Sequence, residues 1–261
     1  MQKQLPQYIY KYVSINKYLY ESLIRGELWF SSPHAFNDPF DSCLPINYSI
    51  ESYKRTIGHE LDAEYYKKEQ QKIVRPMVFN NELEELRNKM GVCCFSSVND
   101  NLIMWSHYAD HHKGLVLKFD VAILEKYFTI IKKVRYTDKI DTVDYDESPE
   151  KIIKKLLSQK STHWKTEKEI RIIVQEKGNY RFPQEALKEI RFGIRCDHHL
   201  QTNIMQLVKK FGYKDAVFSA FHIGNYTYKF DIGYYSSNSD IIGFQKCGDR
   251  KIKIPGLEIE I

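Results

Sequence analysis

Tyr8-Ile9-Tyr10-Lys11-Tyr12-Val13 is strand-like, and a helical segment follows from about Ile15 to Arg25 and ends at Gly26. The chain then turns into Leu28-Trp29-Phe30-Ser31-Ser32-Pro33, a second strand that ends in polar residues. Far downstream, Trp164-Lys165-Thr166-Glu167-Lys168-Glu169-Ile170-Arg171 leads into an apolar strand. This order of strand, glycine-closed helix, strand and distant Glu-x-Glu motif carries more information about the fold than any single motif does.

The rest of the chain predicts an α+β fold with a mixed or antiparallel sheet core. After residue 90, predicted strands outnumber helices and regular βαβ alternation is absent, which argues against a doubly wound sheet. The predicted strands are 91–96, 114–120, 170–174, 190–196, 216–223 and 226–235. The predicted helices after residue 90 are 102–110, 121–127, 149–161 and 197–211.

The domain organisation is expected to be simple. Residues 1–261 are predicted to form a single α+β domain, because a chain of 261 residues suits one large domain and shows no internal repeat. Residues 50–90 are polar, charged and poor in helix breakers. They predict a helical insertion or lid within that domain.

Composition sets broad limits on function. Hydrophobic residues make up 43% and aromatic residues 14%, enough for a sizeable core, and the net charge of +5 permits an anionic partner without requiring one. The 5 cysteines include no Cys-x-x-Cys motif, so neither a disulfide framework nor a zinc knuckle is indicated. No signal peptide and no run of about 18 apolar residues is visible, so we expect a cytoplasmic protein without a membrane partner.

Phe36-Asn37-Asp38-Pro39-Phe40-Asp41 predicts a turn that follows the second strand. Asn37, Asp38 and Asp41 could accept hydrogen bonds from a ribose or an amine in a pocket. The alternative is a rigid turn in which Asn37 bonds its own backbone.

Glu167 and Glu169 are the strongest candidates for acid–base chemistry. If the apolar strand begins there, both carboxylates share one face, and two like charges so close raise one pKa. Arg171 falls on the same face and could pair with either carboxylate, which would lower that pKa instead. A purely structural Glu–Arg ladder is the alternative.

The segment from Met104 to Gly114 is dense in functional side chains. Trp105 and Tyr108 could pack on a ring of a ligand, with His107 as a hydrogen-bond donor, or Trp105 could simply be core. His107 and His111 have the spacing of metal ligands on a helix but lack an obvious third ligand, so no metal site is expected. The chain also has no G-x-G-x-x-G, P-loop, G-x-S-x-G or H-E-x-x-H motif.

These blocks resemble a widespread bacterial family known only as a domain of unknown function and often found near anti-phage genes. The resemblance rests on the glycine-closed first helix, Phe30-Ser31-Ser32-Pro33, Phe36–Asp41, Met104-Trp105-Ser106-His107-Tyr108-Ala109 and Trp164–Arg171. It covers nearly the whole chain and implies kinship, with no assigned chemistry.

The opening and the Glu-x-Glu motif are also similar, more weakly, to ADP-ribosyltransferases, including bacterial enzymes that modify DNA. This resemblance implies NAD as the bound substrate, Glu169 as the catalytic glutamate and Glu167 as the accessory one. It implies that Lys11 or Tyr12 touches NAD and that Ser31 and Ser32 support the nicotinamide side. Glu167 or Asp38 would deprotonate a nucleic acid or protein acceptor. The first strand departs from the usual pattern because it carries neither His-Gly nor an obvious arginine.

The expected function is therefore an NAD-dependent ADP-ribosyltransferase-like anti-phage or toxin effector. One alternative is a metal-dependent nuclease in which Asp38, Asp41, Glu167 and Glu169 bind Mg²⁺. The other is a non-enzymatic sensor of a phage component or nucleotide.

Overall fold

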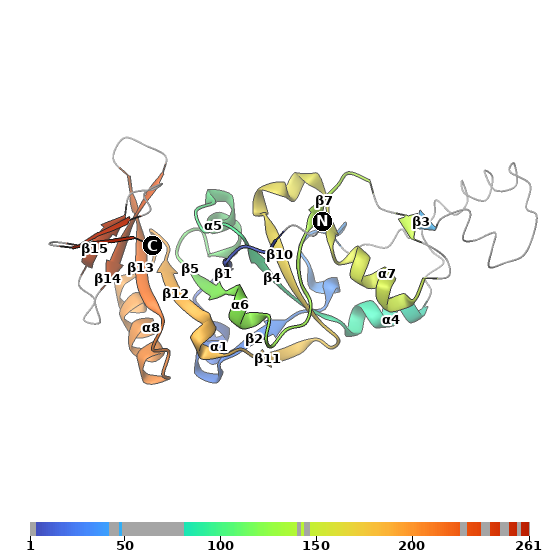
Figure 1. Cartoon of the computed structure of the whole chain (residues 1–261), viewed down its shortest axis with the longest axis horizontal. Helices are drawn as coiled ribbons and strands as arrows, with labels where there is room; N and C mark the ends of the chain where they lie inside the picture. Colours follow the sequence, from blue (N-terminus) through green and yellow to red (C-terminus); the bar gives the residue numbers. More distant parts are fainter. Residues whose placement is uncertain are drawn as a thin grey trace, which may run out of the picture.

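The computed structural model of the chain describes residues 4–41, 47–48, 81–139, 142–143, 147–224, 229–235, 241–245, 251–254 and 257–260. It confirms the α+β class, because helices pack on a large mixed sheet (Figure 1). Within these ranges, no helix combines the length and the apolar character that crossing a membrane requires.

The longer helices are separated by stretches of sheet. They are α1 (Lys17–Arg25), α4 (Asn81–Lys89), α5 (Leu102–Tyr108), α6 (Val121–Leu124), α7 (Pro149–Leu156) and α8 (His198–Lys210). Three short 3-10 helices are η1 (Pro33–Ala35), η2 (Thr162–Glu167) and η3 (Gln184–Ala186).

Within the described ranges, the strands form one 11-stranded sheet and three two-stranded ribbons. In spatial order the large sheet contains β17 (Leu257–Glu260), β16 (Lys251–Ile254), β15 (Ile241–Gln245), β14 (Phe230–Tyr235), β13 (Val217–Ile223), β12 (Leu187–Phe192), β5 (Leu115–Asp120), β1 (Tyr8–Val13), β4 (Gly91–Ser96), β10 (Glu169–Val174) and β6 (Ile131–Lys133). The ribbons pair β2 (Glu27–Phe30) with β11 (Gly178–Arg181), β3 (Asn47–Tyr48) with β8 (Thr142–Val143), and β7 (Arg135–Tyr136) with β9 (Gln159–Lys160).

The first strand lies inside the large sheet and not at its edge. β1 pairs antiparallel with β5 on one side and with β4 on the other, and β4 pairs antiparallel with β10. The strand β12 runs parallel to β13 and antiparallel to β5. The N-terminal strand therefore has residues from the middle of the chain on both sides.

Helix α1 forms where the sequence predicts it, because both of its ends are capped. The side chain of Asn16 accepts hydrogen bonds from the backbone N–H groups of Tyr18 and Leu19. Gly26 ends the helix in the left-handed region at φ 65° and donates its N–H to Ser22. The buried residues Leu19 and Leu23 then fix the helix on the core.

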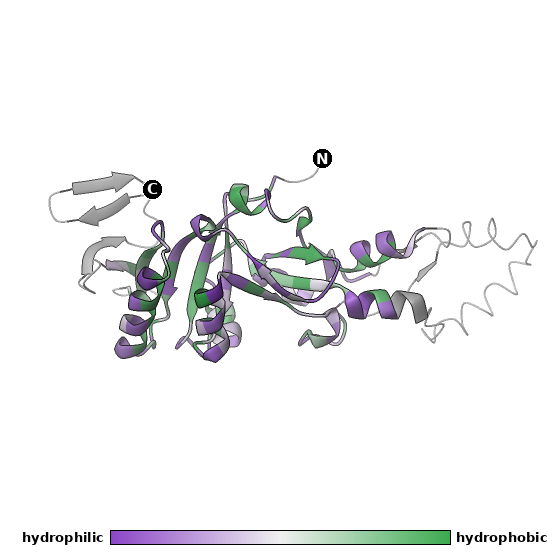
Figure 2. Ribbon diagram, turned by 90° about the horizontal axis from the view of Figure 1, so that it is seen from below, coloured by the Kyte–Doolittle hydropathy of each residue, from purple (hydrophilic) through white to green (hydrophobic). Residues whose placement is uncertain are grey.

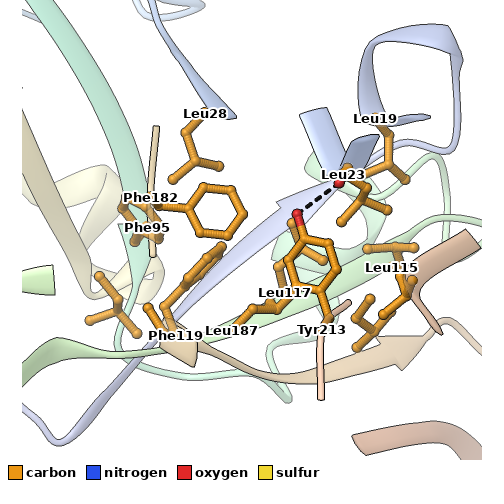
Figure 3. Packing of buried hydrophobic residues seen from close by; sticks show 14 of the residues in the cluster. Leu19, Leu23, Leu28, Phe95, Leu115, Leu117, Phe119, Phe182, Leu187 and Tyr213 are labelled. Carbon is orange, nitrogen blue, oxygen red and sulfur yellow. Dashed lines mark hydrogen bonds between the residues drawn. The ribbon is translucent and has the colours of Figure 1, made fainter. Parts of the chain in front are cut away.

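The main core fills the side of the sheet that α1 and α8 cover. Leucines of α1 and β5 pack there with aromatic rings from several strands, and the hydroxyl of Tyr213 donates to the carbonyl of Leu23 at 2.8 Å (Figure 3). Figure 2 shows the corresponding pattern, with hydrophobic residues along the strands and hydrophilic residues along much of the helices. On the opposite side, α5 covers the sheet with Trp105, which packs edge-on against Tyr12 and Phe221.

Two predictions need comment. In the predicted insertion 50–90, residues 50–80 lie outside the described residues, and the described part is α4 with Met90. The helix predicted over 149–161 ends at Leu156, because Gln159 and Lys160 form β9 beside β7. This difference matters for the site, since it directs Lys160 inward.

Candidate functional site

Neighbouring strands bring the first strand and the Glu-x-Glu motif together. Tyr10 of β1 lies opposite Ser96 of β4, and Ser96 lies opposite Glu169 of β10. Residues directly opposite each other in antiparallel strands present their side chains on the same face. Tyr10, Ser96 and Glu169 therefore form one row across the sheet.

The two glutamates reach the site from different elements. Glu167 ends η2, Lys168 is left-handed at φ 47° and ψ 48°, and only Glu169 begins β10. The expectation that both glutamates share one strand face is thus corrected for Glu167. The turn is held from β4, because the Ser96 hydroxyl donates to the carbonyl of Glu167 at 2.6 Å and the N–H of Ser97 donates to that of Lys168 at 3.0 Å.

Lys160 lies at the centre of three buried carboxylates. Its ammonium is 2.7 Å from Glu167, 3.2 Å from Glu169 and 3.5 Å from Asp41. It also lies 4.9 Å from the centre of the Trp164 ring. A buried ammonium is stable only with such partners, so Lys160 and the carboxylates hold each other in place.

Arg171 forms the second cation of the site. Its Nε and Nη2 donate to the two oxygens of Glu169 at 2.8 and 3.0 Å, and its Nη1 donates to Asp41 at 3.0 Å. Asp41, Glu167, Glu169, Lys160 and Arg171 are all buried, and we refer to these five residues as the charged cluster. Three carboxylates and two cations leave it with one excess negative charge.

The charges within the cluster shift the pKa values of Glu169 and Lys160 in opposite directions. Burial raises the pKa of Glu169, but the positive charges of Arg171 and Lys160 outweigh burial and lower that pKa to about 2. Burial lowers the pKa of Lys160, but Glu169, Glu167 and Asp41 outweigh it and raise that pKa above its ordinary value. Arg171 therefore lowers the glutamate pKa, which is the second of the two outcomes that the sequence left open.

Two tyrosines complete the hydrogen bonding of the glutamates. The Tyr108 hydroxyl donates to Glu167 at 2.7 Å and accepts from the amide of Asn37 at 3.1 Å. The Tyr136 hydroxyl accepts the backbone N–H of Glu169 at 2.7 Å. Burial and the nearby glutamate raise the pKa of Tyr108, and burial raises the pKa of Tyr136 to about 12, so both phenols stay protonated at neutral pH.

A cavity of about 380 Å³, which we call the first cavity, opens beside the charged cluster. This volume is within the roughly 300–1,000 Å³ that is usual for small-molecule sites. Many predicted site residues line it, and they are Lys11, Tyr12, Ser31, Asn37, Tyr108, Glu167 and Glu169. The structure thus brings residues of the first strand, the second strand, the turn and the Glu-x-Glu motif into one site.

Four predicted site residues lie elsewhere. Asp38 accepts a hydrogen bond from the backbone N–H of Phe40 at 2.9 Å, and Ser32 caps η1, so neither is among the residues that line the first cavity. Trp105 is fully buried and donates its indole N–H to the carbonyl of Asn99. His107 is exposed on α5 and also does not line this cavity. Trp105 is therefore placed as core, the alternative that the sequence left open.

Lys11 and Tyr12 differ in orientation. Tyr12 lies on the Glu169 face of β1, where its hydroxyl donates to the carbonyl of Val98 at 3.0 Å. Lys11 lines the cavity, but its ammonium lies 5.4 Å from the centre of the Phe95 ring and donates to the carbonyl of Cys94. Strand alternation explains the difference, because adjacent residues point to opposite faces.

Lys160 is the residue of the candidate site that sequence reasoning missed. Lysine is almost never fully buried unless paired, and the residue was placed in a predicted helix with no motif around it. Asp41 was predicted as a hydrogen-bond acceptor in a pocket or as a metal ligand, and Arg171 as a possible pairing partner of either glutamate. A lysine at the end of an amphipathic helix, shortly before a Glu-x-Glu motif, was the available signal.

The charged cluster does not fit a metal site. The ammonium of Lys160 occupies the position between the three carboxylates that Mg²⁺ would need, and Asp38 is engaged in its own turn. Across the described ranges, no group of three or more His, Cys, Asp and Glu side chains is arranged to hold a metal ion. The nuclease alternative therefore has no support from these residues.

No curated protein and no solved structure matches the chain. A family match covers most of α5, Lys160, both glutamates and Arg171, whereas Asp41 and the strands β1 and β2 precede it. The predicted resemblance to a family of unknown function is confirmed over this segment: residues 104–172 match the family described as "Protein of unknown function (DUF2971)".

Proposed function

We propose that the first cavity binds NAD and that the protein is an ADP-ribosyltransferase-like enzyme acting on a nucleic acid or protein acceptor. The observation that carries the proposal is the convergence on one cavity of Tyr12, Ser31 and the Glu167–Glu169 motif, which belong to three separate segments of the sequence. These positions are the ones that the resemblance to ADP-ribosyltransferases assigns to NAD.

The electrostatics of the charged cluster suit this chemistry. Loss of nicotinamide from NAD passes through an oxocarbenium ion, whose positive charge is stabilised by fixed negative charge nearby. The carboxylates of the cluster are buried, which strengthens their interaction with a cation in the first cavity. Because Arg171 and Lys160 hold Glu169 in place, this carboxylate needs no reorganisation during the reaction.

The two glutamates take different roles in this proposal. Glu169 stays ionised because its pKa is lowered to about 2, so it acts as fixed negative charge beside the ribose. Glu167 accepts from Tyr108 and Lys160, and it is the carboxylate that takes the proton from the acceptor. The proposal therefore assigns the role of general base to Glu167 and not to Asp38, the other candidate. Asn37 and Ser31 offer hydrogen bonds at the cavity wall.

The test compares Glu169→Gln with Glu189→Gln, which removes an equally buried carboxylate outside the first cavity. Purified protein is incubated with NAD and with cell lysate or nucleic acid, and released nicotinamide is measured by chromatography. We expect Glu169→Gln to reduce release by roughly a hundredfold or more, as when one preorganised electrostatic group is removed, and Glu189→Gln to retain it. NAD left intact by the unsubstituted protein in every mixture would reject the transferase and favour the sensor alternative.

A further inference from the structure

A second cavity of about 530 Å³ adjoins the first through one shared residue. One side of it is a stripe of α1 that includes Tyr18, Glu21 and Arg25. The other side is the ribbon of β2 and β11, with Trp29 and Asn179. Trp29 lines both cavities.

The strand β2 leads from one cavity to the other. Leu28 and Phe30 are buried in the core, so alternation places Glu27, Trp29 and Ser31 together on the other side of the strand. Ser31 lines the first cavity, Glu27 lines the second, and Trp29 lies between them. The Trp29 side chain is 57% exposed, so its indole contributes little to the core and is available to a ligand.

The chemistry of the second cavity favours a neutral planar ring. Glu27 is 3.6 Å from Arg181, and Arg25 lies on the same stripe of α1 as Glu21, so two carboxylates are balanced by two guanidinium groups. A free phosphate or a lone cation gains little from such a balance. Trp29 offers a π face, and Asn179, its partner in the ribbon, offers an amide that can both donate and accept.

We infer that the second cavity binds a nucleobase stacked on Trp29, while the rest of the bound molecule extends toward the first cavity. The inference rests on the proposed function for the reacting part of the substrate. The nucleobase has two possible sources, the adenine of NAD or a base of a nucleic acid acceptor. Stacking of one base on an aromatic side chain typically contributes enough to change affinity by roughly tenfold or more.

The experiment measures binding by calorimetry and requires no turnover. The ligands are AMP and a short single-stranded DNA, and NAD and nicotinamide mononucleotide are measured beside them. The variants are Trp29→Leu and Asn179→Ala, and the control is Tyr127→Leu, which removes a similarly exposed aromatic ring (58%) that lines neither cavity. We expect Trp29→Leu to weaken one ligand roughly tenfold, Asn179→Ala to weaken it less, and Tyr127→Leu to change nothing.

The two ligands distinguish the two sources. Loss of AMP affinity, together with loss of the preference for NAD over nicotinamide mononucleotide, assigns the cavity to the adenine of NAD. Loss of DNA affinity with unchanged AMP and NAD affinity assigns it to the acceptor base. Unchanged affinity for both ligands, or no binding to the unsubstituted protein, overturns the inference. Trp29-dependent binding without any consumption of NAD would instead reject the proposed function and leave the nucleobase site standing.

Discussion

The sequence Lys-Glu-Ile-Arg occurs twice in this chain, as Lys168–Arg171 and as Lys188–Arg191. Both copies form a buried Glu–Arg pair on a strand of the same sheet, with Nε of the arginine 2.8 Å from Glu169 in one and 3.0 Å from Glu189 in the other. The first copy joins Lys160, Asp41 and Glu167 beside a cavity. In the second copy, the hydroxyl of Ser219 donates to Glu189, and the ammonium of Lys118 lies 3.4 Å from the same carboxylate.

The two pairs also lie in one row of the sheet. Glu189 is opposite Lys118, Lys118 is opposite Tyr10, Tyr10 is opposite Ser96, and Ser96 is opposite Glu169. Four strand spacings separate the pairs, which corresponds to about 19 Å. The same four-residue sequence therefore lies beside a cavity in the first copy and within a buried ion-pair network in the second. The difference comes from the residues that surround each copy.

The largest expected difference between the copies is in stability. Arg171→Met leaves the three buried carboxylates of the charged cluster with Lys160 as its remaining cation, whereas Arg191→Met leaves the single carboxylate of Glu189 with Lys118 nearby. Removing one partner of a buried ion pair typically costs about 3–5 kcal/mol of unfolding free energy. We expect Arg171→Met to reach or exceed that range and Arg191→Met to fall below it in urea denaturation. Equal losses of unfolding free energy in the two variants would show that Arg171 contributes no more to stability in the charged cluster than Arg191 does in its single ion pair.

The next effect concerns pH. The pKa of Glu169 is about 2 in the fold and about 4.3 in an unfolded chain, so its ionised form stabilises the fold above pH 4.3. This contribution, about 3 kcal/mol, is lost as the pH falls toward 2. Arg191 and Lys118 also lower the pKa of Glu189 against burial. Unfolding measured between pH 6 and 3 should become less acid-sensitive in Glu169→Gln and in Glu189→Gln.

The double variant that combines Glu169→Gln with Glu189→Gln tests whether the two Glu–Arg pairs stabilise the fold independently. Sites so far apart should give additive changes in the unfolding free energy. A non-additive result would mean that Lys118 and Tyr10, which lie between the pairs, couple them.

The smallest effect separates the two lysines that precede the pairs. Lys168 is left-handed at φ 47°, which costs a side chain roughly 1 kcal/mol that glycine avoids. Lys188 lies in β12 and pairs with Asp215 at 3.1 Å. Lys168→Gly should raise the unfolding free energy by up to about 1 kcal/mol, and Lys188→Gly should lower it. A loss in Lys168→Gly would show that the lysine side chain itself supports the turn.

Sequence reasoning predicted most of the fold because the local signals agree with each other. Asn16 and Gly26 cap α1, Asn101 caps α5 and Asp197 caps α8, each where the pattern places a helix end. The sequence did not reveal the strand order, because pairing of β1 with β4 and β5 depends on contacts between distant segments. It also did not reveal Lys160, because a lysine in a polar stretch is normally solvated and only the assembled carboxylates explain its burial.

The position of β1 inside the sheet has a consequence for synthesis on the ribosome. Its partners β4 and β5 begin at Gly91 and Leu115. The backbone groups on both edges of β1 therefore cannot pair until these later residues have been synthesised. At about 5–20 residues per second, that delay lasts on the order of ten seconds. The charged cluster forms later still, because Lys160, Glu169 and Arg171 are synthesised after β4 and β5. A nascent chain therefore cannot assemble the charged cluster before residue 171 has been made.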